Sequence, residues 1–160
     1  MTSKELTKLA VAALEDRKAE DVTVIDISEI SPIADYFIIA NGTNQNQLQA
    51  MRDAADEALY KAGVKVQQIE GNQSSTWILM DYGDIIIHIF SKEDRLFYDL
   101  ERTWRDGKVV DVSELYKKLT KFLSRLSVRR SAAAFCFLLI KIIENGIHQT
   151  LFLKSNTLLQ

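Results

Sequence analysis

Residues 76–90, TWILMDYGDIIIHIF, constrain the fold of this 160-residue chain more than any other stretch. Its second half, residues 85–90, is the most β-prone run in the sequence, because β-branched and aromatic side chains favour extended backbone. Tyr82-Gly83 stands where a two-residue turn belongs, and Gly83 tolerates the positive φ that such a turn requires. The stretch therefore predicts a β-hairpin.

The position of the turn fixes the register of the hairpin, so we expect Asp81 to face Asp84 and Trp77 to face His88. Side chains of a strand alternate between its two faces. One predicted face is wholly aliphatic and is typical of a core: Ile78, Met80, Ile85, Ile87 and Ile89. The other face mixes aromatic, aliphatic, imidazole and carboxylate side chains: Trp77, Leu79, Asp81, Asp84, Ile86, His88 and Phe90.

The mixed face admits two interpretations. Its composition suits a surface that binds a partner, because aromatic side chains beside polar ones are typical of protein interfaces. Alternatively, helices cover the sheet on both sides and Trp77 belongs to the core. The alternation pattern does not distinguish an exposed Trp77 from a buried one, so both interpretations stay open.

Length and composition limit the class of protein. A chain of 160 residues with 47% hydrophobic residues predicts one domain with a full core. The single cysteine, Cys136, excludes a disulfide framework within the chain and any multi-cysteine metal site. No stretch reaches the roughly 18 apolar residues of a transmembrane helix, and the N-terminus has no signal-peptide or transit-peptide pattern. We therefore expect a cytoplasmic protein that does not associate with membranes.

The net charge of −2 conceals an asymmetry between two parts of the chain. Residues 1–112 contain 12 Lys and Arg against 20 Asp and Glu, a net charge of −8, whereas residues 113–160 contain 8 against 2, a net charge of +6. An acidic domain repels phosphate groups, which argues against direct nucleic-acid binding by residues 1–112. The same charge would attract a basic protein partner.

The remaining periodicity predicts an α/β fold with a mixed sheet of about five strands and flanking helices. Helices are expected over residues 2–18, 44–62 and 92–105, and strands over residues 22–27, 36–40, 64–69, 77–81 and 85–90, with Val109 and Val110 docking back as an extended segment. Thr2 with Glu5, and Asn44 with Gln47, have the spacing of capping boxes. Gly63 is expected to end the second helix. In the last helix, Leu96, Leu100 and Trp104 are spaced by four and predict one packed face.

Acidic residues are the best indication of enzymatic chemistry, since no phosphate-binding glycine loop and no G-x-S-x-G nucleophile motif is present. Asp81 and Asp84 facing each other across the turn would repel, and a Mg²⁺ ion between them would relieve that repulsion. Asp26 or Asp35 could supply a third ligand. A basic partner would relieve the repulsion equally well, so a metal-dependent enzyme using Asp81 and Asp84 is the alternative hypothesis.

One set of residues carries a resemblance to a known family. The set comprises Asp35-Tyr36-Phe37-Ile38-Ile39-Ala40-Asn41-Gly42, Gln47, Glu70-Gly71 leading to Trp77, Asp81-Tyr82-Gly83-Asp84, His88-Ile89-Phe90, Arg95-Leu96-Phe97-Tyr98-Asp99-Leu100-Glu101 and Trp104. In this order and spacing, residues 1–112 resemble the ribosomal silencing factor family, also called the Iojap family. The family is similar in fold to nucleotidyltransferases, so the alternative hypothesis is then a metal-dependent nucleotidyltransferase-like enzyme. Against this alternative, the family lacks the catalytic carboxylate set of nucleotidyltransferases.

The resemblance implies a function without catalysis or a cofactor. Such a factor is a homodimer when free and binds ribosomal protein number fourteen of the large subunit, on the face that meets the small subunit. It thereby blocks subunit joining and represses translation when nutrients are scarce. The implied partner contacts are Trp77 and Leu79, and further matching positions are Tyr82, Asp84, His88, Arg95 and Tyr98.

Residues 113–160 depart from the family pattern and form a predicted basic, partly helical extension. Leu115, Leu119, Phe122, Leu123 and Leu126 follow helical spacing among basic residues. Such a segment can lie on ribosomal RNA or on a membrane surface, or can be an extension without a binding role. The sequence does not select among these.

Overall fold

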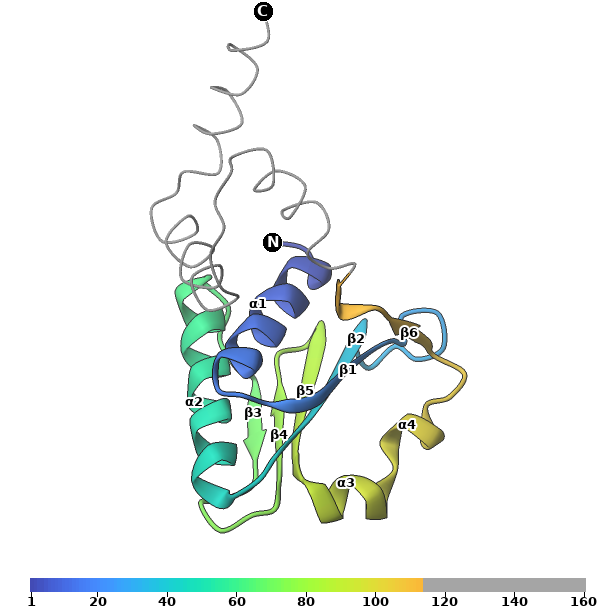
Figure 1. Ribbon diagram of the computed structural model, residues 1–160. Coiled ribbons are helices and arrows are strands. Elements are labelled where there is room, and N and C mark those ends of the chain that lie inside the picture. The colour runs from blue at the N-terminus through green and yellow to red at the C-terminus, as the bar shows by residue number, and fades with distance from the viewer. Residues whose placement is uncertain (114–160) are drawn as a thin grey trace, which may run out of the picture. The chain divides into compact units, whose positions relative to one another are not determined.

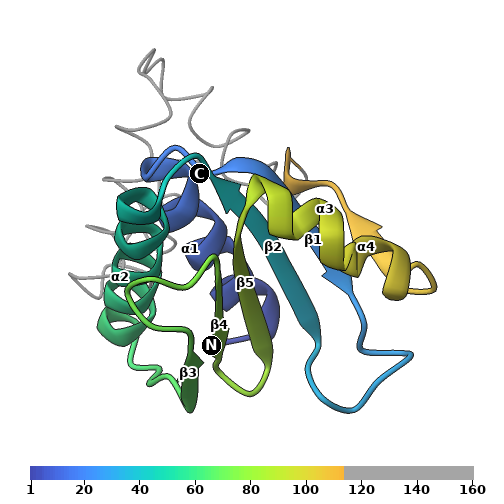
Figure 2. The same ribbon diagram turned by 90° about the horizontal axis from the view of Figure 1, so that it is seen from below.

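A computed structural model describes residues 1–113 as a mixed sheet with helices on both faces (Figures 1 and 2). In chain order the elements are α1 (Ser3–Asp16), β1 (Glu20–Asp26), β2 (Tyr36–Gly42), α2 (Gln45–Lys61), β3 (Gln68–Glu70), β4 (Trp77–Asp81), β5 (Ile85–Ser91), α3 (Lys92–Tyr98), α4 (Leu100–Thr103) and β6 (Lys108–Val110). The predicted extension over residues 113–160 lies outside the described residues except for Ser113.

The sheet has six strands in the order β3-β4-β5-β2-β1-β6. β2 and β5 pair in parallel, and the other neighbouring pairs are antiparallel. The predicted mixed α/β sheet is confirmed, with one strand more than the expected five. The additional strand is β6, which forms where the extended segment at Val109 and Val110 was expected and pairs with the edge of β1.

Capping interactions mark the ends of the two longest helices, α1 and α2. The Thr2 and Glu5 capping box is present at the start of α1. At α2, Asn44 Oδ1 accepts the N–H of Gln47 at 2.9 Å, but the Gln47 side chain instead accepts the N–H of Thr43 at 2.7 Å. The second expected capping box is therefore only half formed. Gly63 follows α2 with φ 84°, as its role as a helix terminator requires.

The two sheet faces differ in how completely they are covered. α1 and α2 cover one face, and the aliphatic side chains of the hairpin predicted to form a core are buried there: Ile78, Met80, Ile85, Ile87 and Ile89. α3 and α4 lie over the other face, as Figure 2 shows from below. The core on that side consists of Ile25, Ile27, Ala34, Phe37, Ile39, Ile86 and Phe90, with Trp77, Leu79, Leu100 and Trp104 partly buried against it. The core interpretation therefore holds in part, because helices cover this face (Figure 2) but leave Trp77 partly exposed, and the binding interpretation stays a prediction.

The hairpin is confirmed, but the predicted register is wrong by two residues. Trp77 lies opposite Phe90 rather than His88, and Asp81 lies opposite Ile86 rather than Asp84. A shift of two leaves each side chain on its expected face, because side chains alternate with a period of two. The two predicted faces are therefore correct even though the predicted partners are not.

Turn chemistry explains the shift in register. The turn residues are Gly83 and Asp84 rather than Tyr82 and Gly83, and the N–H of Tyr82 donates to the carbonyl of Ile85 at 3.0 Å to close the turn. Gly83 has φ 82°, so the glycine occupies the first turn position instead of the second. The Asp81 carboxylate accepts the N–H of Gly83 at 2.7 Å and stabilises this placement.

Two further expectations are corrected by the structure. The helix predicted over residues 92–105 is interrupted at Asp99, whose φ of 44° and ψ of 58° place it in the left-handed region between α3 and α4. The strand predicted over residues 64–69 is reduced to β3. Among the helices of residues 1–113, none is both long and apolar enough to cross a bilayer.

Candidate partner-binding face

Aromatic rings from two strands and one helix form a continuous row on the incompletely covered face. Trp77 of β4 stacks on Phe90 of β5 with ring centroids 4.9 Å apart. The ring of Tyr98 in α3 lies 4.7 Å from that of Trp77 and 6.3 Å from that of Phe90. Phe97 continues the row with an edge-on contact to Tyr98 at 5.1 Å. The row therefore runs from the buried Phe90 outward to a ring that is 80% exposed.

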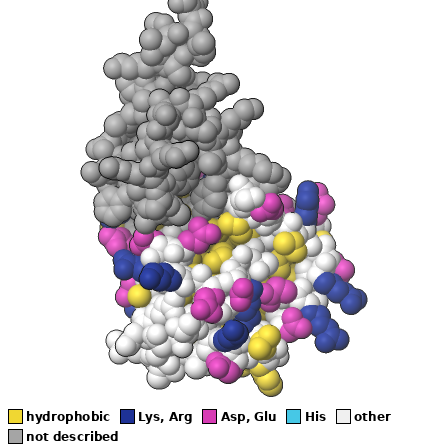
Figure 3. All heavy atoms as spheres, in the orientation of Figure 1, with side chains coloured by type: hydrophobic (Ala, Val, Ile, Leu, Met, Phe, Trp, Pro, Cys, Tyr) yellow, Lys and Arg dark blue, Asp and Glu magenta, His cyan; other side chains and the backbone are white. Residues whose placement is uncertain are grey.

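The exposed part of this surface is apolar. We call it the aromatic face and define it as Trp77, Leu79, Leu96, Phe97 and Tyr98. Leu96 and Phe97 are the most exposed large hydrophobic side chains of residues 1–113, at 76% and 80%, and Tyr98 is 44% exposed. Figure 3 shows hydrophobic side chains standing out at the lower edge of the molecule, where α3 lies in Figure 1. Exposed apolar groups gathered in this way are typical of a surface that binds a partner.

Leu96 corrects an expectation from helical spacing. Its distance of four residues from Leu100 predicted that both lie on one packed face with Trp104. The left-handed Asp99 resets the phase of the helix, so Leu100 and Trp104 turn toward the core while Leu96 turns to solvent. The sequence signal that could have revealed this is weak: an aspartate is among the few residue types other than glycine that tolerate the left-handed region.

Acidic residues flank the aromatic face. Glu70 of β3 pairs with Leu79 across the strands, and Asp81 follows on the same face of β4. Glu93 and Asp94 occupy the first turn of α3, where the helix dipole favours negative charge, and the Asp94 carboxylate bonds to the Thr76 hydroxyl. Lys92 precedes them in α3, so the border carries both signs of charge with carboxylates in excess. Such a border suits a basic protein surface better than nucleic acid.

His88 lies beneath Trp77 and does not reach the surface. The indole Nε1 of Trp77 donates a hydrogen bond to Nδ1 of His88 at 3.3 Å, so the neutral ring carries its proton on Nε2. Burial lowers the pKa of His88 to about 4, because the charged form is poorly solvated there. Among the described residues, Nε2 is buried without a hydrogen-bond partner. His88 therefore supports Trp77 from inside.

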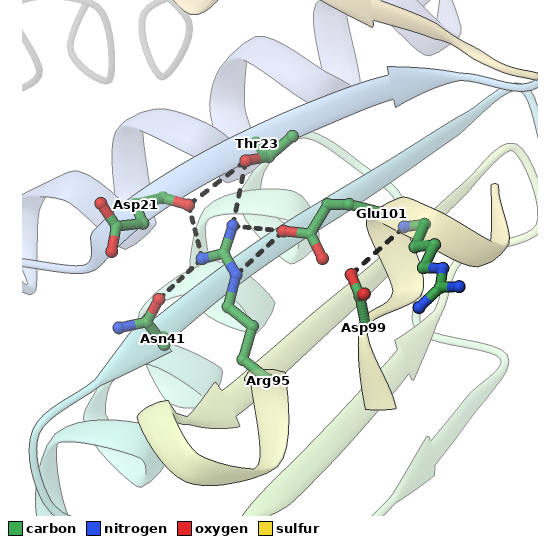
Figure 4. Close-up of polar contacts among 7 residues, drawn as sticks. Asp21, Thr23, Asn41, Arg95, Asp99 and Glu101 are labelled. Carbon is green, nitrogen blue, oxygen red and sulfur yellow. Dashed lines mark hydrogen bonds and ion pairs between the residues drawn. The ribbon is translucent and has the colours of Figure 1, made fainter. Parts of the chain in front are cut away.

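Arg95 is also turned inward (Figure 4). Its side chain is 12% exposed and forms an ion pair with Glu101 at 2.6 Å. The guanidinium also donates to the Asn41 side chain, the Asp21 carbonyl and the Thr23 hydroxyl, as the dashed lines in Figure 4 mark. The side chain of the expected site residue Arg95 thus lies between α3 and the sheet and not on the aromatic face.

Tyr82 and Asp84 lie away from the aromatic face. Tyr82 is on the opposite face of the sheet, where its hydroxyl donates to Asp56 of α2 at 3.0 Å, and burial together with that carboxylate raises the pKa of Tyr82. Asp84 is exposed in the hairpin turn, at the far end of the hairpin from the Trp77 and Phe90 pair. Of the seven expected site residues, Trp77, Leu79 and Tyr98 belong to the aromatic face, and His88 contacts Trp77 from inside. Arg95 is in the same helix as Tyr98, but its side chain points to the sheet.

The geometry also removes the premise of the metal hypothesis. Asp81 and Asp84 do not face each other, and the Asp81 carboxylate is bonded to the turn backbone. Asp26, one candidate third ligand, accepts hydrogen bonds from the N–H and the hydroxyl of Ser28 at 3.1 and 2.6 Å. Asp35, the other candidate, bonds to the Ser3 hydroxyl. Over residues 1–113, no group of three or more His, Cys, Asp or Glu side chains is placed to hold a metal ion.

Comparison with protein families and known proteins gives consistent matches. The family model for ribosomal silencing factor during starvation matches residues 1–133. The ribosomal silencing factor RsfS of Bacillus subtilis is 39% identical over 116 residues, which cover 70% of this chain and 95% of that protein. The RsfS of Halalkalibacterium halodurans is 37% identical over 112 residues, covering 70% of this chain and 96% of that protein.

Solved structures and a more distant relative extend the comparison. The crystal structure of a protein from Chromobacterium violaceum matches with a TM-score of 0.64 and 35% identity, covering 65% of this chain and 87% of that chain. A crystal structure from Bacillus halodurans matches with a TM-score of 0.60 and 34% identity, over 67% and 97% of the respective chains. A mouse protein named mitochondrial assembly of ribosomal large subunit protein 1 is 31% identical over 60% of this chain and 43% of its own length.

Proposed function

Because the chain belongs to the ribosomal silencing factor family, we propose that it binds the large ribosomal subunit and blocks association with the small subunit. The partner in this proposal is ribosomal protein number fourteen of the large subunit. Binding represses translation under nutrient limitation. The factor acts in the cytoplasm by obstruction, and no covalent bond is made or broken.

The observation that carries the proposal is the exposed aromatic face on an acidic domain. Trp77 and Tyr98 pack on a buried core, which preorganises them, and leave part of their rings free for a partner. Aromatic side chains held in this way are typical hot spots of protein interfaces, because they bury a large area at little cost in side-chain entropy. The acidic border adds attraction toward a basic ribosomal protein.

The remaining parts of the proposal concern the free protein and its extension. In the absence of ribosomes the factor forms a homodimer. Residues 113–160, whose net charge is +6, contact ribosomal RNA once the acidic domain has docked on protein. Membrane association has no role in this proposal.

Co-sedimentation with purified large subunits tests the docking surface. Trp77→Ala is expected to weaken binding at least tenfold, because truncation of a central hot-spot Trp costs about 2–4 kcal/mol. Tyr60→Ala is the matched control, since Tyr60 is an exposed aromatic residue of α2 on the other side of the sheet. Undiminished co-sedimentation of the Trp77 variant would refute the proposal.

Two additions make the experiment decisive. Trp77 also packs on Phe90, so Leu79→Ala serves as a milder variant of the same surface if Trp77→Ala is poorly folded. Wild-type protein added to separated subunits should keep them apart in a density gradient, and Trp77→Ala should not. Subunits that join normally in the presence of bound wild-type protein would show that binding does not obstruct.

A further inference from the structure

We propose that Arg95 is a positioning residue that anchors α3 to the sheet and thereby places Leu96, Phe97 and Tyr98 beside Trp77 as one docking surface. The placement of α3 stands on the geometry alone. Only the last step, the effect on ribosome binding, rests on the proposed function.

The guanidinium of Arg95 uses all five of its N–H donors (Figure 4). Nε and one Nη2 hydrogen donate to Glu101 Oε1 at 2.9 and 2.6 Å. Nη1 donates to the carbonyl of Asp21 at 2.5 Å and to Asn41 Oδ1 at 2.7 Å. The second Nη2 hydrogen donates to Thr23 Oγ1 at 3.0 Å. A guanidinium with no free donor and little exposure is poorly suited to recognise a partner directly.

The acceptors on the sheet come from two neighbouring strands. The register of β1 with β2 shifts between Glu20 and Thr23, and Asp21 within this irregularity has φ 48°. The irregularity presents the Asp21 carbonyl and the Thr23 hydroxyl to the same guanidinium. Bulges in strands commonly redirect groups in this way next to functional sites. Asn41 is a buried residue of β2, so the third acceptor belongs to the rigid sheet.

The fourth acceptor ties α3 to α4. Glu101 lies in α4, beyond the left-handed Asp99, and accepts two hydrogen bonds from Arg95. The ion pair therefore spans the break between the two helices and fixes their relative orientation. Tyr98, whose ring packs at a tilt against Trp77, immediately precedes that break.

Hydrophobic burial contributes little to holding α3 in place. The helix has seven residues, none of which is buried. A helix of two turns is marginal in water without tertiary support. Its other attachments are the Ser91 cap, the bond between Asp94 and Thr76, and the Tyr98 ring on Trp77. Among these contacts, Arg95 is the residue that connects the middle of α3 to β1 and β2.

A spectroscopic experiment separates positioning from direct contact. The chain has two Trp residues, so Trp104→Phe leaves Trp77 as the only indole. In this background Arg95→Lys keeps the positive charge but loses the planar fork of donors. We expect the Trp77 emission to shift to longer wavelength and its near-ultraviolet circular dichroism to weaken, with the far-ultraviolet spectrum unchanged. Arg102→Lys, an exposed residue of α4, is the matched control and should change neither signal.

Co-sedimentation with large subunits completes the test. Arg95→Lys should weaken binding at least fivefold together with the change in Trp77 emission. An unchanged Trp77 signal overturns the inference, and a changed signal with full binding overturns the link to docking. If Arg95→Lys does not fold, Thr23→Val removes one acceptor of the guanidinium and should give a smaller change of the same sign. Absence of wild-type binding would refute the proposed function but leave the spectroscopic test of Arg95 valid.

Discussion

The indole N–H of Trp77 points into the protein and donates to Nδ1 of His88 at 3.3 Å. The hydrogen-bonding group of this aromatic residue is therefore already used, and what Trp77 offers a partner is apolar ring surface. The same bond requires an unprotonated Nδ1, so it exists only while His88 is neutral. The orientation of Trp77, the proposed docking residue, is thus linked to the protonation of a buried histidine.

This link predicts how stability depends on pH. Burial lowers the pKa of His88 from 6.5 to about 4, so between these values the unfolded chain binds a proton that the folded chain does not. The free energy of unfolding should therefore fall as the pH is lowered from 6.5 to 4, by up to about 3 kcal/mol from this residue. Urea unfolding of wild-type protein across this range measures the effect.

His88→Gln provides the comparison, because it removes the titrating group and leaves the carboxylates unchanged. The difference in unfolding free energy between wild type and variant should narrow as the pH falls through the same window. Parallel curves for the two proteins would show that the buried imidazole is not responsible.

The sequence determined the two faces of the hairpin more securely than its register. Alternation of Ile78, Met80 and Ile87 with polar or aromatic neighbours assigns the faces whatever the exact turn, because the period is two. The register depends on whether Gly83 takes the first or second turn position, and the Tyr-Gly pair does not decide this. The carboxylate of Asp81, bonded to the Gly83 N–H, is the local interaction that decides it.

The sequence indicates the candidate site only in part. Alternation places Trp77 and Leu79 on the mixed face of one strand, but it is the family resemblance that implies they contact a partner. The exposure of Leu96 and Phe97 on the aromatic face depends on the break at Asp99, and helical periodicity alone does not reveal that break. Arg95 acquires its role from acceptors about 54 to 74 residues away in sequence, and no local pattern encodes such contacts.

Tyr82 supplies a prediction that separates structural from contact residues. Its hydroxyl donates to Asp56 at 3.0 Å on the helix-covered face of the sheet. Tyr82→Phe should lower the free energy of unfolding by about 1–2 kcal/mol, because a hydrogen bond to a carboxylate is lost, and should leave large-subunit binding unchanged. Urea unfolding and co-sedimentation measure the two effects.

A double-mutant comparison tests whether the loss of stability in Tyr82→Phe comes from the hydrogen bond between Tyr82 and Asp56. In an Asp56→Ala background, Tyr82→Phe should cost distinctly less, because its acceptor is already gone. If Tyr82→Phe instead weakened ribosome binding at unchanged stability, Tyr82 would have to be regarded as a contact residue.

Asp99 supplies the last prediction, since the break between α3 and α4 depends on its conformation. With φ 44° and ψ 58° it occupies the left-handed region, and its side chain also accepts the N–H of Arg102 as the cap of α4. Asp99→Ala loses the cap and places an alanine in an unfavourable backbone region, so it should lower the free energy of unfolding by about 1–2 kcal/mol. Asp99→Gly loses the cap but gains conformational freedom in that region, and its stability should stay within about 0.5 kcal/mol of wild type.

Urea unfolding of the two Asp99 variants, with Asp106→Ala as an exposed control, measures the difference. Because the break lies next to Tyr98, Asp99→Ala should also weaken large-subunit binding more than Asp99→Gly does. Equal stability of the alanine and glycine variants would mean that the left-handed residue is not what separates the helices, and the exposure of Leu96 would then need another cause.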